Sequence, residues 1–218
     1  MITNNFCKWT EINIVCEGRS EENFVKKVLN KYFSSKQIKL IPYRLKNSNS
    51  DNIGGNVSID RLIDCLCRCN TAIITTFVDY YGFKNNKDDV VHLENNILNE
   101  YNKKSKNSKI LIPYVQMHEF EALLFSDIDI ISEKMNANND QKCELAKIIK
   151  EYDYNPEKIN NSAETAPSKR LEKIFKGYKK TIDGITISEN IGLDKIKENC
   201  KKFNEWLIKI EEKVKELR

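Results

Sequence analysis

Residues 71–78, which read TAIITTFV, form a run that is apolar or β-branched throughout. A strand that faces water on one side alternates apolar and polar residues, so an unbroken run of this kind predicts a strand buried on both faces. Such strands lie inside parallel sheets whose two faces are covered by helices. Because Asp79 follows the run directly, we expect a carboxylate at the carboxyl end of a central strand.

Strand and helix patterns alternate around this run. Strand patterns occupy residues 10–16, 38–45 and 110–115, and helical patterns begin behind Ser20 and occupy residues 58–69 and 91–101. The alternation predicts an α/β fold with a mostly parallel four-stranded sheet flanked by helices. Right-handed crossovers place Glu17, which follows the first strand, at the same sheet edge as Asp79. Open sheets of this type bind their ligands at that edge.

The chain becomes helical and irregular after residue 128. We therefore expect an α/β domain over residues 1–130 and a helical C-terminal extension over residues 131–218 that packs on it. Apolar residues near the C-terminus repeat with spacings of three and four, as in coiled coils. Over only about three heptads, this pattern is more typical of a helix that packs on its own domain.

Charge and cysteine content constrain the class of protein only loosely. The 36 Lys and Arg residues against 32 Asp and Glu residues give a net charge of +4, so overall charge alone does not indicate a nucleic-acid partner. The chain has no apolar run near the roughly 20 residues that span a bilayer and no signal-peptide pattern, which predicts a cytoplasmic protein without a membrane partner. Seven scattered cysteines, an odd number, favour free thiols.

A third acid of interest lies within residues 116–127, which read QMHEFEALLFSD. The spacing of the apolar residues predicts a helix that begins near His118, with Glu121 in an otherwise apolar turn. A carboxylate in such surroundings is costly unless a cation or hydrogen bonds compensate it. Glu121 is therefore the charge in this chain that most requires an explanation.

Basic residues gather between Ser168 and Lys180. Against one acid, Glu172, the segment has six basic residues: Lys169, Arg170, Lys173, Lys176, Lys179 and Lys180. Pro167 predicts the start of a helix here, and helix N-termini attract phosphate groups. We expect Lys169, Arg170 and Lys173 to contact a nucleic-acid backbone.

Glu17, Asp79 and Glu121 together suit Mg²⁺ or Mn²⁺, because these hard cations prefer oxygen ligands. A cation held by them would polarise a phosphoryl oxygen and activate water. Each residue also has a simpler interpretation: Glu17 as a solvated turn residue, Asp79 as a helix cap and Glu121 as the partner of a buried arginine. The basic segment would then be the solvated face of a surface helix, and His118 a packed histidine.

Several segments resemble a known family. IVCEGRSEENF resembles the first motif of TOPRIM domains, in which a Glu follows the first strand, and FVDYYG resembles the second, in which an Asp follows a later strand. With PYVQMHEFEALLFSD, ETAPSKRLEKIFKGYKK and FNEWL, nearly the whole chain resembles a bacterial TOPRIM-like family of unknown function that is related to OLD-type nucleases. The resemblance implies a TOPRIM or Rossmann-like fold. It also implies that members are often encoded beside an ABC-type or SMC-type ATPase.

By this resemblance, Glu17, Asp79 and Glu121 are the metal ligands and Lys169 steadies the scissile phosphate. The usual second motif is Asp-x-Asp, whereas Tyr81 stands where the second Asp is expected. Glu121 is expected to replace that missing ligand.

Two functions follow as hypotheses. The first is a nuclease that uses Mg²⁺ or Mn²⁺ to hydrolyse DNA or RNA, as the effector of an anti-phage defence module with an ATPase partner. The alternative is a catalytically silent, TOPRIM-like subunit that regulates or scaffolds the ATPase. A nucleotidyl transferase is disfavoured, because no further nucleotide-binding motif is visible. The sequence leaves the oligomeric state open, a homo-oligomer included.

Overall fold

The computed structural model describes residues 9–45, 57–83, 89–106, 108–159 and 165–218. Its sheet is parallel throughout, with the strand order β2-β1-β3-β4 and with β5 beside β3. The strands are β1 (Thr10–Cys16), β2 (Ile38–Arg44), β3 (Ile73–Asp79), β4 (Ile110–Ile112) and β5 (Val115–Gln116). The predicted α/β fold is thereby confirmed.

Strand β3 lies in the middle of the sheet, between β1 and β4, and every one of its residues is buried. This confirms the strand predicted from its continuous apolar run. The register with β1 pairs Cys16 with Phe77, so the residues that follow these two lie side by side. Glu17 and Asp79 therefore reach the same edge of the sheet, as predicted.

The fourth strand is interrupted. The single strand predicted over residues 110–115 consists of two short strands, β4 and β5, on either side of Pro113. Proline has no backbone N–H for a sheet ladder. The hydroxyl of Thr76 on β3 bridges the interruption, because its Oγ1 donates to the carbonyl of Tyr114 and accepts from the amide of Tyr114, both at 2.7 Å.

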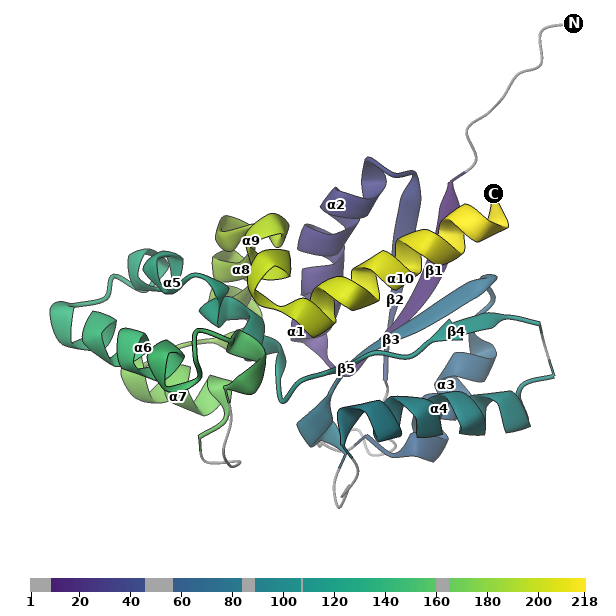
Figure 1. Cartoon of the computed structure of the whole chain (residues 1–218), viewed down its shortest axis with the longest axis horizontal. Coiled ribbons are helices and arrows are strands. Elements are labelled where there is room, and N and C mark those ends of the chain that lie inside the picture. The colour runs from purple at the N-terminus through teal and green to yellow at the C-terminus, as the bar shows by residue number, and fades with distance from the viewer. Residues whose placement is uncertain (1–8, 46–56, 84–88, 107, 160–164) are drawn as a thin grey trace, which may run out of the picture.

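Helices cover both faces of the sheet (Figure 1). On one face lie α3 (Ile59–Arg68) and α4 (Val90–Lys104), which share an apolar core with Val15, Ile74 and Val78. The other face is covered by the helical segment α1 (Arg19–Phe24), η1 (Val25–Leu29) and α2 (Asn30–Ser34), together with α10 (Lys201–Leu217). The parallel sheet is thus buried between two helical layers, as such sheets require.

The C-terminal helix α10 packs its apolar seam on the sheet. Trp206 stacks on Tyr114, with ring centroids 4.3 Å apart, and its Nε1 donates to Thr75 Oγ1 at 2.8 Å. Cys200 separates α10 from the preceding helix, α9 (Leu193–Asn199). The heptad-like pattern therefore belongs to a helix that packs on its own domain.

The remaining helices join α9 beside the sheet edge (Figure 1). They are η3 (Phe120–Ser126), α5 (Ile128–Lys134), α6 (Asn139–Glu151), η4 (Pro156–Lys158), α7 (Pro167–Ile174), η5 (Lys180–Gly184) and α8 (Ile185–Ile191). A short 3-10 helix, η2 (Tyr80–Gly82), follows β3 directly. None of the helices in the described ranges combines the length and apolarity needed to span a bilayer.

One predicted helix differs in type and begins two residues later than His118. The helix expected to begin near His118 is the 3-10 helix η3, which begins at Phe120. His118 has a φ of +67°, and a left-handed backbone cannot continue into a right-handed helix. His118 is thus the turn residue that redirects the chain from β5 into η3.

Candidate functional site

Glu17 and Asp79 are joined directly at the sheet edge. The backbone amide of Asp79 donates to Glu17 Oε2 at 3.1 Å. Glu17 is half-buried, so it is not the solvated turn residue of the simpler interpretation. Asp79 is the N-cap residue of η2, but its side chain accepts no capping hydrogen bond. Neither simple role accounts for these two acids.

Gly82 allows the carboxylate of Glu17 to lie where it does. A Cβ added at Gly82 would be 2.4 Å from Glu17 Oε2 and 2.8 Å from Val57 Cγ2. Because atoms cannot approach so closely, any side chain at position 82 must displace the Glu17 carboxylate.

Gly82→Ala is therefore expected to weaken every function that depends on the position of Glu17. A displacement of about 1 Å at a reacting group can cost on the order of 100-fold in rate, so we expect Mn²⁺-dependent cleavage to fall by roughly that factor. The melting temperature should also fall, because the added methyl group would lie 2.8 Å from Cγ2 of the buried Val57, which cannot move as freely as the Glu17 carboxylate. Val91→Ala, at a side chain on α4 that is 60% exposed, is the comparison and should match the wild type in both measurements. Cleavage by Gly82→Ala at the wild-type rate would show that the position of Glu17 is unimportant.

A fourth acid, Glu21, lies beside this pair and was not predicted from the sequence. It is the third residue of α1 and is buried, and its Oε2 accepts a hydrogen bond from the amide of Gly18 at 2.9 Å. The sequence signal is a Glu three residues after the residue that caps the helix. That signal indicates only a helix start. It does not predict the contact between Glu21 and Lys180.

Glu121 is fully buried on η3. A cation lies beside it, and that cation is Lys180 rather than the arginine of the simpler interpretation. Lys180 Nζ lies 2.9 Å from Glu121 Oε2, 3.6 Å from Asp79 Oδ2 and 3.9 Å from Glu21 Oε1. We call Glu17, Glu21, Asp79, Glu121 and Lys180 the acid cluster. Its residues come from the ends of β1 and β3 and from α1, η3 and η5.

One ammonium group does not balance these acids. Burial raises the pKa of Asp79 well above its usual value, and the neighbouring acids add to the rise against the opposing effect of Lys180. Burial likewise raises the pKa of Glu121, to about 7. Burial lowers the pKa of Lys180, but Glu121, Asp79 and Glu21 outweigh it, so that this pKa lies well above its usual value. The cluster is short of positive charge.

Three oxygens of the cluster are buried without a hydrogen bond from the described residues, and one of them, Glu121 Oε2, has the ion pair with Lys180. Asp79 Oδ1 and Glu121 Oε1 accept no hydrogen bond from any residue within the described ranges. Buried carboxylate oxygens are normally hydrogen-bonded or bound to a cation. These oxygens are hard ligands of the kind that Mg²⁺ and Mn²⁺ prefer, so the donor set fits such an ion.

The cluster is not arranged as a finished metal site. Across the part of the chain that the structure describes, no three or more His, Cys, Asp or Glu side chains are positioned to hold one metal ion. The ammonium group of Lys180 lies among three of the acids instead.

The predicted basic residues lie on α7, outside the cluster. Lys169 is exposed and pairs with Glu172 at 2.6 Å, and Lys173 is exposed. Arg170 is largely engaged in packing, since its Nη2 donates to the hydroxyl of Tyr152 at 2.7 Å. The structure thus places Lys180, rather than Lys169, among the carboxylates.

The N-terminus of α7 is nevertheless attached to the segment that carries Glu121. The amide of Ser168 donates to Glu119 Oε2 at 3.0 Å. Side-chain hydrogen bonding to Glu172 raises the pKa of Lys169, and Glu119 and Glu121 contribute to the rise. The exposed start of α7 and the acid cluster therefore belong to one region of the surface.

His118 packs against two aromatic rings rather than joining the cluster. Its ring centroid lies 5.7 Å from that of Tyr81 and 6.5 Å from that of Tyr80. Burial lowers the pKa of His118, so the ring is mostly neutral at pH 7. This agrees with the interpretation of His118 as a packed histidine.

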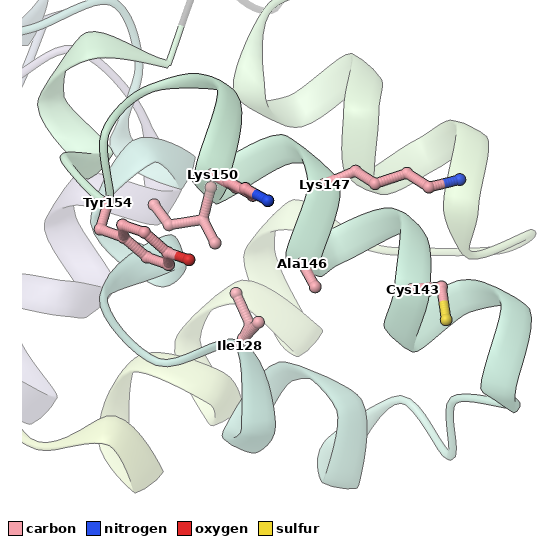
Figure 2. Close-up of a pocket in the computed structure, with 7 residues that line it drawn as sticks. Ile128, Cys143, Ala146, Lys147, Lys150 and Tyr154 are labelled. Atoms are coloured by element: carbon pink, nitrogen blue, oxygen red, sulfur yellow. The ribbon is translucent and has the colours of Figure 1, made fainter.

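A separate pocket of about 340 Å³ lies between α5 and α6 (Figure 2). Its walls are mainly apolar, and Tyr154 and the stem of Lys150 border it. The lining residues are Ile128, Cys143, Ala146, Lys147, Ile149, Lys150 and Tyr154. No residue of the acid cluster is among them, so this pocket is not part of the candidate site.

The fold and the site define a parallel α/β protein with an acidic cluster at the carboxyl edge of its sheet. The chain belongs to the family described as a domain of unknown function (DUF4276), which matches residues 16–211. No curated protein and no solved structure gives a significant match. The family description states no activity, so the resemblance to TOPRIM domains and OLD-type nucleases stays a prediction.

Proposed function

We propose that this chain is a phosphodiesterase that hydrolyses DNA or RNA with Mg²⁺ or Mn²⁺. The observation that carries the proposal is the convergence of acids at the carboxyl edge of the sheet, where two buried carboxylate oxygens lack partners. Glu17, Asp79 and Glu121 are the residues that would hold the ion, and Glu21 adds negative charge beside them. When bound, the ion would polarise a phosphoryl oxygen and lower the pKa of a bound water.

The residues of this chain supply binding and position. The hydrogen bond from the Asp79 backbone amide to Glu17 Oε2 orients the Glu17 carboxylate beside Asp79 before substrate arrives. Exposed Lys169 and Lys173 would hold backbone phosphates of the nucleic acid near the site, with Arg170 fixing the start of α7. Phosphate contacts of this kind position a nucleic acid without reading its sequence.

A second candidate is a catalytically silent subunit that regulates or scaffolds an ATPase. It is favoured by Tyr81, which stands where TOPRIM domains have a second Asp, and by Lys180, whose ammonium group forms an ion pair with Glu121. The ATPase partner, the role in anti-phage defence and the cytoplasmic location stay predictions under either function.

The proposal is tested by incubating the purified chain with single-stranded and double-stranded DNA and RNA in Mn²⁺, with and without EDTA. We expect cleavage that EDTA stops and that Glu17→Ala abolishes. Glu11→Ala removes an exposed acid of β1, the strand that Glu17 follows, and should cleave like the wild type. Full activity in Glu17→Ala would sink the assignment, and tight Mn²⁺ binding without cleavage of any substrate would favour the silent subunit.

A further inference from the structure

We propose that Lys180 and a divalent cation exclude each other from the acid cluster, so that the site is closed by its own ammonium group until a metal ion displaces it. The inference rests on the proposed function, because it concerns the metal site proposed there. It adds a regulatory property to that site and assigns the property to one residue.

Lys180 and a bound metal ion would share ligands. Lys180 Nζ contacts one oxygen each of Glu121, Asp79 and Glu21. Two of these residues, Asp79 and Glu121, are also proposed metal ligands, and their second oxygens are buried and unpaired. A Mg²⁺ ion requires oxygens at about 2.0 to 2.1 Å. An ammonium group 2.9 Å from Glu121 Oε2 and such an ion would therefore lie within a few ångströms of each other, where like charges repel strongly.

The charge of the cluster favours a divalent ion over the ammonium group. Glu121, Asp79 and Glu21 surround a single ammonium group, and Glu17 is joined to Asp79 by a hydrogen bond. A divalent ion brings twice the charge of the ammonium group and can be contacted by the oxygens that Lys180 leaves unpaired. The exchange of one cation for the other therefore improves the compensation of the buried acids.

The Lys180 side chain, unlike that of Glu121, is partly open to solvent. The side chain of Lys180 is 34% exposed, whereas that of Glu121 is fully buried. Part of the Lys180 stem therefore reaches solvent, while its ammonium group lies among the buried acids. Rotation about this flexible stem would carry the ammonium group outward and free the oxygens that it contacts.

The backbone that carries Lys180 is fixed. Tyr178 is buried two residues before it, and Gly184 packs so closely on Tyr178 that an added Cβ would be 2.8 Å from the Tyr178 hydroxyl. We therefore expect an exchange of cations to move the Lys180 side chain rather than η5.

The test is calorimetric titration of Mn²⁺ into wild type, Lys180→Met and Lys180→Gln. Lys180→Gln keeps a hydrogen-bond donor toward Glu121. It therefore provides a second test if Lys180→Met does not fold. If Lys180 competes with the metal, its removal should tighten Mn²⁺ binding at least about tenfold, because the ion no longer displaces a bound charge. Lys179→Met, at the exposed neighbouring lysine, should bind Mn²⁺ like the wild type.

The outcomes separate this inference from the proposed function. Equal or weaker Mn²⁺ binding by both Lys180 variants, with Mn²⁺-dependent cleavage by the wild type, overturns the exclusion and leaves the nuclease proposal standing. Tighter binding by the variants, with no cleavage by any of the proteins, supports the exclusion and contradicts the nuclease. Absence of Mn²⁺ binding in all of them overturns both.

Discussion

Asp79→Asn is expected to abolish Mn²⁺-dependent cleavage of nucleic acid, by at least about 100-fold, without lowering the melting temperature. A metal ligand contributes to an effect worth several kcal/mol in the transition state, and each 1.36 kcal/mol is about tenfold in rate. Stability should not fall, because burial raises the pKa of Asp79 and the ionised carboxylate is therefore the unfavourable form in the folded state. The amide resembles the neutral form.

The measurements are initial cleavage rates and thermal unfolding of the same preparations. Asp194→Asn changes an aspartate whose side chain is 89% exposed, and it should match the wild type in both. An Asp79→Asn protein that melts far below the wild type would instead assign Asp79 a structural role. Retention of cleavage by a folded variant would remove Asp79 from the proposed ligand set.

Glu121→Gln is expected to change the pH dependence of stability in metal-free buffer. Burial raises the pKa of Glu121 from 4.5 to about 7, so between these pH values the folded protein holds a proton that the unfolded chain releases. Stability from this group is therefore fully present below pH 4.5 and is lost as the pH rises through 7. At 1.36 kcal/mol per pKa unit, the loss is about 3 kcal/mol.

The quantity to measure is the difference in free energy of unfolding between wild type and Glu121→Gln, from denaturant titrations in EDTA between pH 4.5 and 8. The wild type should lose about 3 kcal/mol relative to the variant across this range. Glu198→Gln, whose side chain is 68% exposed, should show no such change. A constant difference between wild type and Glu121→Gln would mean that Glu121 is ionised throughout and that Lys180 compensates it fully.

Part of the site was predictable because it depends on local order along the chain. Glu17 and Asp79 each follow a strand, and parallel strands bring such residues to one edge whatever the details of packing. Glu121 was identified by contrast, as a charge in an apolar segment. These three arguments require only the period of a strand or helix and the hydrophobicity of the neighbours.

Lys180 was visible in the sequence only as the last of six basic residues, in a segment whose start at Lys169 seemed the better candidate. Nothing in its spacing distinguishes it from Lys176 or Lys179. The break at Gly177, with a φ of +94°, separates it from α7, and η5 then directs it toward Glu121. Gly177 is predictable from the sequence as a helix stop, but the direction that the chain takes after it, which decides which lysine meets the acids, is not.

The same distinction holds for the whole chain. By itself, the sequence determined the parallel α/β sheet and the placement of Glu17 and Asp79 at its carboxyl edge, because apolar periodicity and crossover handedness depend on residues close together along the chain. That Glu21 and Lys180 complete the acid cluster became visible only in the folded structure. Side chains about 60 to 160 positions apart along this sequence meet only after the segments between them have packed, and no local pattern encodes such a meeting.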